Sequence, residues 1–306
     1  MSASVLFDAP GPRARARHRL TALAGALLVA AFVAFALFKL GERGNLAADK
    51  WSPFATGSMW VDYLIPGLLN TLKAAAISIV LAAIFGLVFG MGRLSHNGPI
   101  RWLSTVVVEF FRSVPVLVMM MAAFGLYTFN NVFQSEINPL AAVVTGLTLY
   151  NGAVVAELLR SGVGGLPRGQ SEAGLSIGLT PTQTLRAILL PQAVTAMLPA
   201  LVGQLVVVLK DTALGQIITY PELLNTYQQI GSNWGNPVPA ILFIAVIFIL
   251  INYALTVLAA RVESRLRRRG RPTIHEAAGG PGAPAPVEDA TDEARHHADE
   301  ERLRGH

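Results

Sequence analysis

The fold class of this chain is decided by an apolar run at residues 64–92, LIPGLLNTLKAAAISIVLAAIFGLVFGMG, in which Lys73 is the only charged residue. An α-helix rises about 1.5 Å per residue, so about 20 apolar residues cross the hydrocarbon core of a bilayer. This run is therefore long enough to span a membrane. Within it, Gly86 and Gly90 have the spacing that lets two membrane helices pack closely.

Five further runs are similarly long and apolar. Together the runs predict an all-α polytopic membrane bundle with six transmembrane helices, at residues 20–40, 64–92, 103–129, 139–159, 192–218 and 239–260. The composition agrees, since only 14% of the residues are charged, whereas about 25% is typical of soluble domains. There is no cysteine, which excludes disulfides and thiolate metal sites. We expect no metal site, no cofactor and no catalytic residue.

The two ends of the chain differ from the apolar middle. The run at 20–40 follows a basic segment at 1–19; a cleaved signal peptide is one interpretation, but the run is long and no clear cleavage site follows, which favours a retained helix. The segment 272–306 has almost no large apolar residues and is expected to be a disordered tail.

Lys and Arg residues in the loops predict the orientation. Counted on alternate sides of the six spans, fifteen lie on one side and two on the other. The positive-inside rule places the fifteen in the cytoplasm, and both termini with them. The net charge of +5 thus comes from the flanks of membrane spans and does not indicate a nucleic-acid partner.

The longest loop on the basic side, at 160–191, has an organised pattern. The stretch from Glu172 to Gly178 predicts a short helix that ends at the glycine. Thr180 and Pro181 then predict the cap and first residue of another helix. Such a loop is either a docking element for a partner protein or an amphipathic connector on the lipid surface.

This loop resembles the EAA loop of permease subunits in bacterial ABC importers. The matching residues are Glu172-Ala173-Gly174, then Gly178, then Ile188-Leu189-Leu190-Pro191. Gly174 stands where that family has a second alanine, and a glycine lowers helix stability by about 1 kcal/mol. The departure weakens the expected docking helix without removing it.

Further motifs are similar to those of the polar amino acid permeases. They are Glu109-Phe110-Phe111-Arg112-Ser113-Val114-Pro115, Ala156-Glu157-Leu158-Leu159-Arg160-Ser161-Gly162, Pro167-Arg168-Gly169-Gln170 and Leu209-Lys210-Asp211-Thr212. The segment Val5-Leu6-Phe7-Asp8-Ala9-Pro10-Gly11-Pro12 is similar to the glutamate-importer permeases of actinobacteria.

The resemblance implies a subunit of an ATP-driven importer of a polar amino acid, glutamate being the favoured substrate, in the bacterial plasma membrane. Its five-span core would be 64–262, with the helix at 20–40 added. Implied partners are ATPase subunits, a like or unlike second permease chain that completes the pathway, an extracytoplasmic solute-binding protein, the amino acid and the lipid bilayer. The implied ATPase-docking residues are Glu172, Ala173, Gly174, Leu175, Gly178, Leu190 and Pro191.

Polar residues within the spans are candidates for the substrate pathway, because charge in a bilayer is costly. They are Asp211, Lys210, Glu157, Asn151, Asn70, Glu109 and Arg112. Glu109 could instead pair with Arg112, and Glu157 with Arg160, while the asparagines could bond neighbouring helices. Asp211 could bind the substrate ammonium group or cap a broken helix. In the outward loop at 219–238, we expect Glu222, Asn225 and Gln228 to contact the binding protein.

Two other classes of protein are compatible with six spans. An ion-coupled secondary transporter often shows internal repeats, and we find none. An intramembrane enzyme would need acid–base or metal-binding residues within the spans, and every histidine lies outside them. A secondary transporter would also not need a cytoplasmic docking loop.

Overall fold

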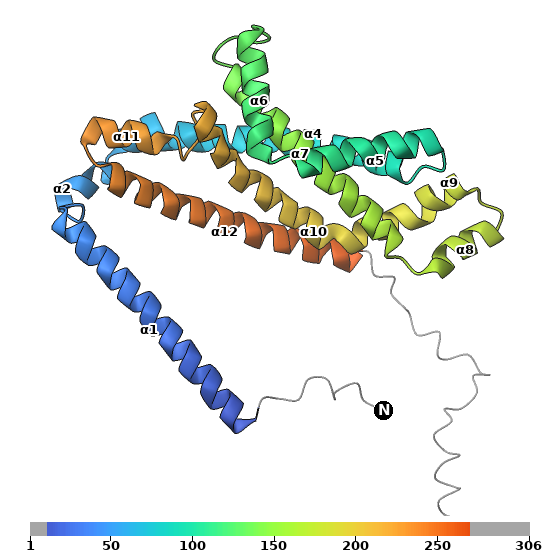
Figure 1. The fold of residues 1–306 in the computed structure, drawn as a ribbon, viewed down its shortest axis with the longest axis horizontal. Helices are drawn as coiled ribbons and strands as arrows, with labels where there is room; N and C mark the ends of the chain where they lie inside the picture. The colour runs from blue at the N-terminus through green and yellow to red at the C-terminus, as the bar shows by residue number, and fades with distance from the viewer. Residues whose placement is uncertain (1–10, 270–306) are drawn as a thin grey trace, which may run out of the picture. The chain divides into compact units, whose positions relative to one another are not determined.

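The computed structural model describes residues 11–269, and its regular structure there is entirely helical. The described residues up to Ser264 form one compact unit; Arg265 begins a second unit, of which only the end of α12 is described. The expected tail at 272–306 lies outside the described residues. The elements (Figure 1) are α1 (Pro12–Glu42), α2 (Ala48–Trp51), η2 (Ser52–Ala55), α3 (Gly57–Met59), η3 (Trp60–Leu64), α4 (Ile65–Arg93), α5 (Gly98–Ser113), α6 (Val116–Phe129), α7 (Asn138–Gly164), α8 (Arg168–Ser176), α9 (Pro181–Thr184), η4 (Leu185–Leu189), α10 (Leu190–Asp211), η5 (Thr212–Ile218), α11 (Thr226–Trp234) and α12 (Pro237–Arg269).

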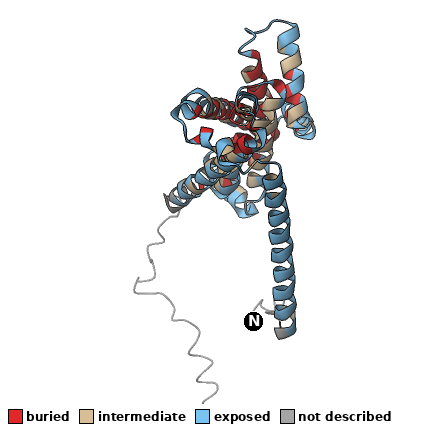
Figure 2. Cartoon of the chain, turned by 90° about the vertical axis from the view of Figure 1, so that its left-hand side faces the viewer, coloured by how far each residue is buried: buried red, intermediate tan, exposed pale blue. Residues whose placement is uncertain are grey.

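Five helical segments in this range are long and apolar enough to cross a membrane, and the bent pair α5 and α6 makes a sixth if it is counted as one span. This confirms the predicted all-α polytopic bundle. The helices α4 and α7 form the centre of the unit, where Figure 2 shows most of the buried residues.

Small residues let α4 and α7 approach each other. A Cβ atom at Gly86 would overlap Val155, and one at Gly90 would lie 2.9 Å from Leu159. Close packing at these two glycines is therefore confirmed, and it sets the spacing of the helices that carry the polar sites.

The predicted span at 103–129 is not one straight helix, because α5 and α6 meet at an angle of 98°. The break lies at Val114, which has an extended backbone, and Pro115. Proline disfavours the helical conformation in the residue before it and has no N–H to donate. The sequence contains the proline at this point, but it does not indicate the angle of the bend.

The fifth span also begins earlier than predicted. Helical structure runs from Pro181 to Ile218, so the end of the loop at 160–191 and the expected span at 192–218 are one element. A π-helical turn, η4, stands just before Pro191, which lacks the N–H that a regular helix requires. The α9–η4 segment of the loop is thus continuous with α10.

Helix α1 makes little contact with the rest of its unit. The most apolar part of α1 is entirely unburied, and Figure 2 shows the helix exposed along its length. It therefore contributes nothing to the core around α4 and α7.

Candidate functional site

The loop between α7 and α10 folds into the two short helices that the sequence predicted. Gly178 joins them with a φ of +87°, a value that L-residues rarely adopt. The Leu179 N–H donates to the carbonyl oxygen of Gly174 (3.2 Å), which closes the end of α8. Thr180 accepts a hydrogen bond from the Gln183 N–H (3.3 Å), and Gln183 accepts one from the Thr180 N–H (2.8 Å), so α9 begins with a capping box.

The residues of α8 face two directions. Glu172, Ala173 and Leu175 are exposed, and 47% of Leu175 is accessible. Gly174 is buried instead, and a Cβ atom there would lie 2.6 Å from the Thr184 side chain. The expectation that Gly174 meets the ATPase was wrong: the glycine allows α8 to pack on the start of the next helix.

Other residues complete the exposed face of this loop. Ile177 comes directly after the end of α8 and is 75% exposed. It was not among the expected docking residues. Leu190 is half-buried and Pro191 is exposed, both at the start of α10. The Gln192 side chain donates to that of Gln170 (3.0 Å), which ties α8 to α10. The structure therefore presents Glu172, Ala173, Leu175 and Ile177 together on a braced element.

A cluster of five charged side chains joins α4, α5 and α7, and we call it the arginine network. Arg93, at the end of α4, lies 2.9 Å from Glu109 and 2.8 Å from Glu157. Glu157 also lies 2.6 Å from Arg160, and Arg112 lies 3.4 Å from Glu109. Only 6% of the Arg93 side chain is exposed, so this guanidinium is the centre of the network.

The arginine network changes the interpretation of three expected pathway residues. Arg93 and Arg112 neutralise Glu109 and Glu157 across three helices, so none of the three expected pathway residues needs the substrate as a partner. The pairing of Glu109 with Arg112 was anticipated, but Arg93 was counted only as a loop charge. No sequence spacing could indicate it, because its partners lie on other spans.

Asn151 is the first of the expected polar residues that lie deeper in the spans. The Asn151 side chain is fully buried, donates to the Leu147 carbonyl oxygen (2.8 Å) and accepts from the Gln204 side chain (2.5 Å), thereby joining α7 to α10. Both side chains line an otherwise apolar cavity of about 200 Å³. Gln204 was missed by the sequence reading.

Asp211 and Lys210 stand where α10 ends and the tighter helix η5 begins, as the expected break at Thr212 required. The Asp211 side chain caps neither helix, which contradicts one of its two expected roles. Thr212 donates to the Leu209 carbonyl oxygen (2.6 Å) instead. Asp211 is half-buried and Lys210 is exposed. Within the described range, Asp211 therefore has no hydrogen-bonded role inside the protein.

The loop after η5 is held by hydrogen bonds. Asn70 on α4 donates through its side chain to the Pro221 carbonyl oxygen (2.8 Å), and its own carbonyl oxygen accepts from the Tyr220 hydroxyl (2.8 Å). The expected role of Asn70 in the pathway is thus replaced by one in fixing this loop. Burial, with the nearby Glu222 carboxylate, raises the pKa of Tyr220 to about 12.

Glu222 does not form the surface contact expected of it. Its side chain is fully buried and accepts from the N–H groups of Leu224 (2.7 Å) and Asn225 (2.6 Å). Burial raises the pKa of Glu222 to about 7, although these two hydrogen bonds oppose the rise. Asn225 is half-buried and Gln228 is exposed, so only these two expected residues reach the surface.

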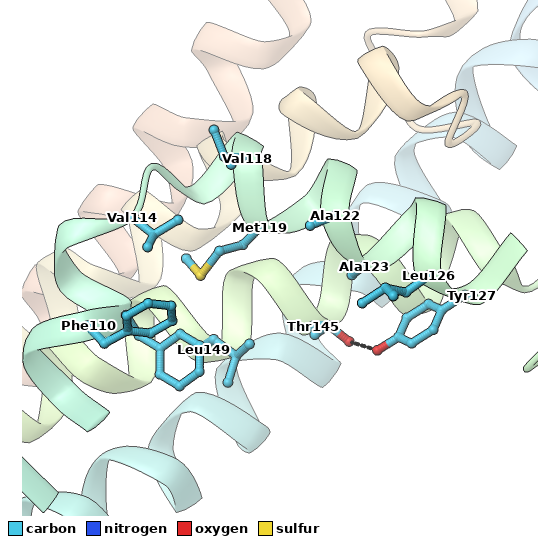
Figure 3. A pocket seen from close by; sticks show the side chains of 11 residues that line it. Phe110, Val114, Val118, Met119, Ala122, Ala123, Leu126, Tyr127, Thr145 and Leu149 are labelled. Carbon is cyan, nitrogen blue, oxygen red and sulfur yellow. Dashed lines mark hydrogen bonds between the residues drawn. The ribbon is translucent and has the colours of Figure 1, made fainter. Parts of the chain in front are cut away.

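The bend between α5 and α6 borders an apolar cavity of about 300 Å³ (Figure 3). Phe110, Val114, Met119 and Leu149 line it, and the Tyr127 and Thr145 hydroxyls form a hydrogen bond (2.8 Å) at one end. No charged side chain lines it. An amino acid carries two charged groups that would be costly to bury there unpaired, so this cavity is unsuited to binding one.

Residues 78–268 match the family described as binding-protein-dependent transport system inner membrane component. The chain belongs to this family. The match includes the loop at 160–191, the arginine network, Asp211 and the loop around Glu222, whereas α1 and Asn70 lie outside it. The polar sites described above, Asn70 excepted, therefore lie in the family's own part of the chain.

Curated members of the family that resemble this chain are permease proteins. GluD, the glutamate transport system permease of Corynebacterium glutamicum, is 46% identical over 74% of this chain and 84% of its own length. The probable glutamine ABC transporter permease GlnP of Bacillus subtilis is 35% identical over 66% and 93%. The glutamate/aspartate import permease GltK of Escherichia coli is 32% identical over the same shares.

Solved structures of transporters have the same fold. A crystal structure of an amino acid ABC transporter matches with a TM-score of 0.61 at 27% identity, over 66% of this chain and 93% of the other. The methionine transporter MetNI matches with a TM-score of 0.57 at 19% identity, over 69% and 99%. These comparisons support an ABC permease and give no support to an ion-coupled secondary transporter.

Proposed function

We propose that this chain is the permease subunit of an ABC importer of polar amino acids, with glutamate the first substrate to test. The observation that carries the proposal is the braced loop of a binding-protein-dependent family member, with Glu172, Ala173 and Leu175 exposed on one short helix. Such a surface suits docking of an ATPase subunit, because its backbone is rigid and its side chains are free. ATP would be hydrolysed by that partner.

The membrane arrangement follows from the loop charges. We place the docking loop, the arginine network and both termini in the cytoplasm, and the loop around Glu222 outside the plasma membrane. The five-span core is the functional part; α1 is an addition that transport does not require, since it packs on nothing in that core. A second permease chain, like or unlike, completes the pathway.

The substrate and binding-protein contacts are assigned from expected residues whose side chains are exposed or have no hydrogen bond to the described residues. Asp211 is the favoured contact for the ammonium group, because a half-buried acid in a span needs a cation or water. Exposed Lys210 is retained as a pathway candidate. Asn225 and Gln228 remain the proposed contacts for the solute-binding protein.

The decisive experiment is uptake by the complex reconstituted in liposomes with its ATPase and binding protein. Labelled glutamate, glutamine, arginine and histidine are compared, and ATP-dependent glutamate uptake is expected. Uptake that follows an ion gradient without ATP would contradict the proposal.

The docking role is tested with Glu172→Lys, which should abolish ATP-driven uptake while the chain still inserts. Glu136→Lys is the matched control, since this exposed acid lies in the turn before α7, away from the docking loop. Normal uptake with Glu172→Lys would assign docking elsewhere.

The pathway role is tested with Asp211→Asn, which keeps the size of the side chain and removes its charge. We expect a higher half-saturation concentration or loss of uptake, with assembly and basal ATPase activity intact. Unchanged transport would exclude Asp211 as the ammonium contact.

A further inference from the structure

A third cavity lies beside the α9–η4 segment, and the proposed function does not use it. It is a cavity of about 290 Å³ between the end of α4, the start of α5 and the α9–η4 segment. These elements lie next to one another in Figure 1. We call it the α4–η4 cavity.

The polar part of the α4–η4 cavity suits an anion. Arg186 of η4 and His96 of the α4–α5 turn both line it and are exposed, and no acidic residue lines it. Neither side chain has a hydrogen bond or ion pair to the described residues. Arg101 reaches the same turn, donating to the Ser95 carbonyl oxygen (3.4 Å). Guanidinium and imidazole N–H groups are ordinary donors to phosphate oxygens.

The remaining wall of the cavity is apolar and open. Val88 is 60% exposed and Ile100 is 49% exposed. From Val88 to Leu94 the wall follows α4 for about 9 Å, at 1.5 Å per residue. That length is comparable to the headgroup zone at one side of a bilayer, which is roughly 5–8 Å thick. The cavity thus passes from apolar to cationic along the direction in which a lipid passes from acyl chain to phosphate.

We propose that the α4–η4 cavity binds one anionic phospholipid of the cytoplasmic leaflet. The phosphate lies against Arg186 and His96, and the upper part of an acyl chain lies along Val88 and Ile100. A free phosphate ion would use the cationic part and gain nothing from the apolar wall, so the two parts together indicate the lipid.

The site has a consequence for coupling, which rests on the proposed function of the docking loop. Leu185 and Arg186 belong to η4, which is continuous with α10, whereas the opposite wall belongs to α4 and α5. A lipid held between them braces the docking loop against the bundle. Anionic lipid is therefore expected to increase the ATPase activity that is coupled to transport.

The test measures retention of phosphatidylglycerol by the full complex, using native mass spectrometry after exchange with phosphatidylcholine. Wild type is expected to retain phosphatidylglycerol, and Arg186→Gln to lower its affinity by roughly fivefold, the effect of one basic residue at an anionic surface. Arg261→Gln is the matched control, because this exposed arginine on α12 does not line the cavity. Equal retention by wild type and Arg186→Gln, or an equal loss in the control, would overturn the site.

A third variant separates the lipid from a free anion. Val88→Ser should weaken retention of phosphatidylglycerol, since it removes part of the acyl-chain wall and leaves the cations in place. If Val88→Ser has no effect and inorganic phosphate displaces phosphatidylglycerol, the cavity is an anion site and the lipid proposal is wrong. Retention is read without transport, so the lipid site can stand even if the chain fails to import amino acids.

Discussion

Glu157 and Glu222 are both carboxylates largely withdrawn from solvent, and they are stabilised in different ways. Glu157 lies among Arg93, Arg112 and Arg160, and 20% of its side chain is exposed. Glu222 is fully buried with two backbone N–H groups, and no arginine or lysine pairs with it within the described range. Full charges thus hold the helices together at the proposed cytoplasmic end, whereas neutral donors hold the outer loop.

This difference predicts that the stability of the two regions responds differently to mutation and to pH. Removing the buried Arg93 guanidinium takes away the cation that Glu109 and Glu157 share, which is costly. The outer loop has no cation to lose, but its carboxylate changes its protonation near neutral pH. Mutation should therefore affect the first region most, and pH the second.

The largest effect is expected for Arg93→Met. It leaves Glu109 and Glu157 without their central partner. Because Glu109 is half exposed and Arg112 and Arg160 stay close, we expect a loss near the lower end of the range of about 3–5 kcal/mol for a broken buried pair. The loss should appear as a lower melting temperature and poor recovery of the assembled complex. Lys73→Met is the control: this lysine is exposed on the same helix and forms no ion pair to the described residues. Equal stability of the two variants would show that Arg93 does not organise the network.

The second-largest effect is a change in the free energy of unfolding with pH, which Glu222 causes. Its pKa rises from an ordinary value of 4.5 to about 7, so the folded state holds the proton more tightly than the unfolded state. The contribution of Glu222 to the free energy of unfolding is then fully present below pH 4.5, falls as the pH rises from 4.5 to 7, and is constant above that. The fall is on the order of 3 kcal/mol.

Glu222→Gln should abolish this slope, which thermal melting from pH 4.5 to 8 would measure. Glu136→Gln, at an exposed glutamate, should retain the wild-type slope. If Glu222→Gln also retains it, another group causes the pH dependence.

A smaller loss of stability is expected for Tyr220→Phe. The change removes the hydroxyl that donates to the Asn70 carbonyl oxygen and should lower the free energy of unfolding by about 1 kcal/mol, as for a neutral hydrogen bond. Tyr253→Phe, at a tyrosine that is 69% exposed, is the control in the same melting assay. A loss as large as that of Arg93→Met would contradict the contrast between the two regions.

The smallest effect is expected for Arg160→Gln. Its ion pair with Glu157 is short, but 46% of the Arg160 side chain is exposed, and water screens such a pair. A decrease below about 1 kcal/mol is expected, and it should shrink further in high salt. A decrease that salt does not alter would indicate that Arg160 acts through packing.

The sequence predicted where the apolar spans lie, because apolar length is a local property, but it did not predict the bend between α5 and α6 or the early start of the fifth span. It also predicted the turn at Gly178 and the cap at Thr180, each of which depends on a few adjacent residues. It failed where the outcome depends on distant neighbours. Three features arise only when separate helices come together. They are the burial of Glu222, the packing of Gly174 on Thr184 and the central position of Arg93.

The bend between α5 and α6 has a consequence for biogenesis. The two helices have 16 and 14 residues, which correspond to about 24 Å and 21 Å of helix. Neither can cross a hydrocarbon core of about 30 Å alone. We therefore expect the pair to remain at the membrane surface during synthesis until α7 emerges from the ribosome, so that this span enters the bilayer late. Glycosylation mapping of truncated chains that end before and after α7 would reveal this order.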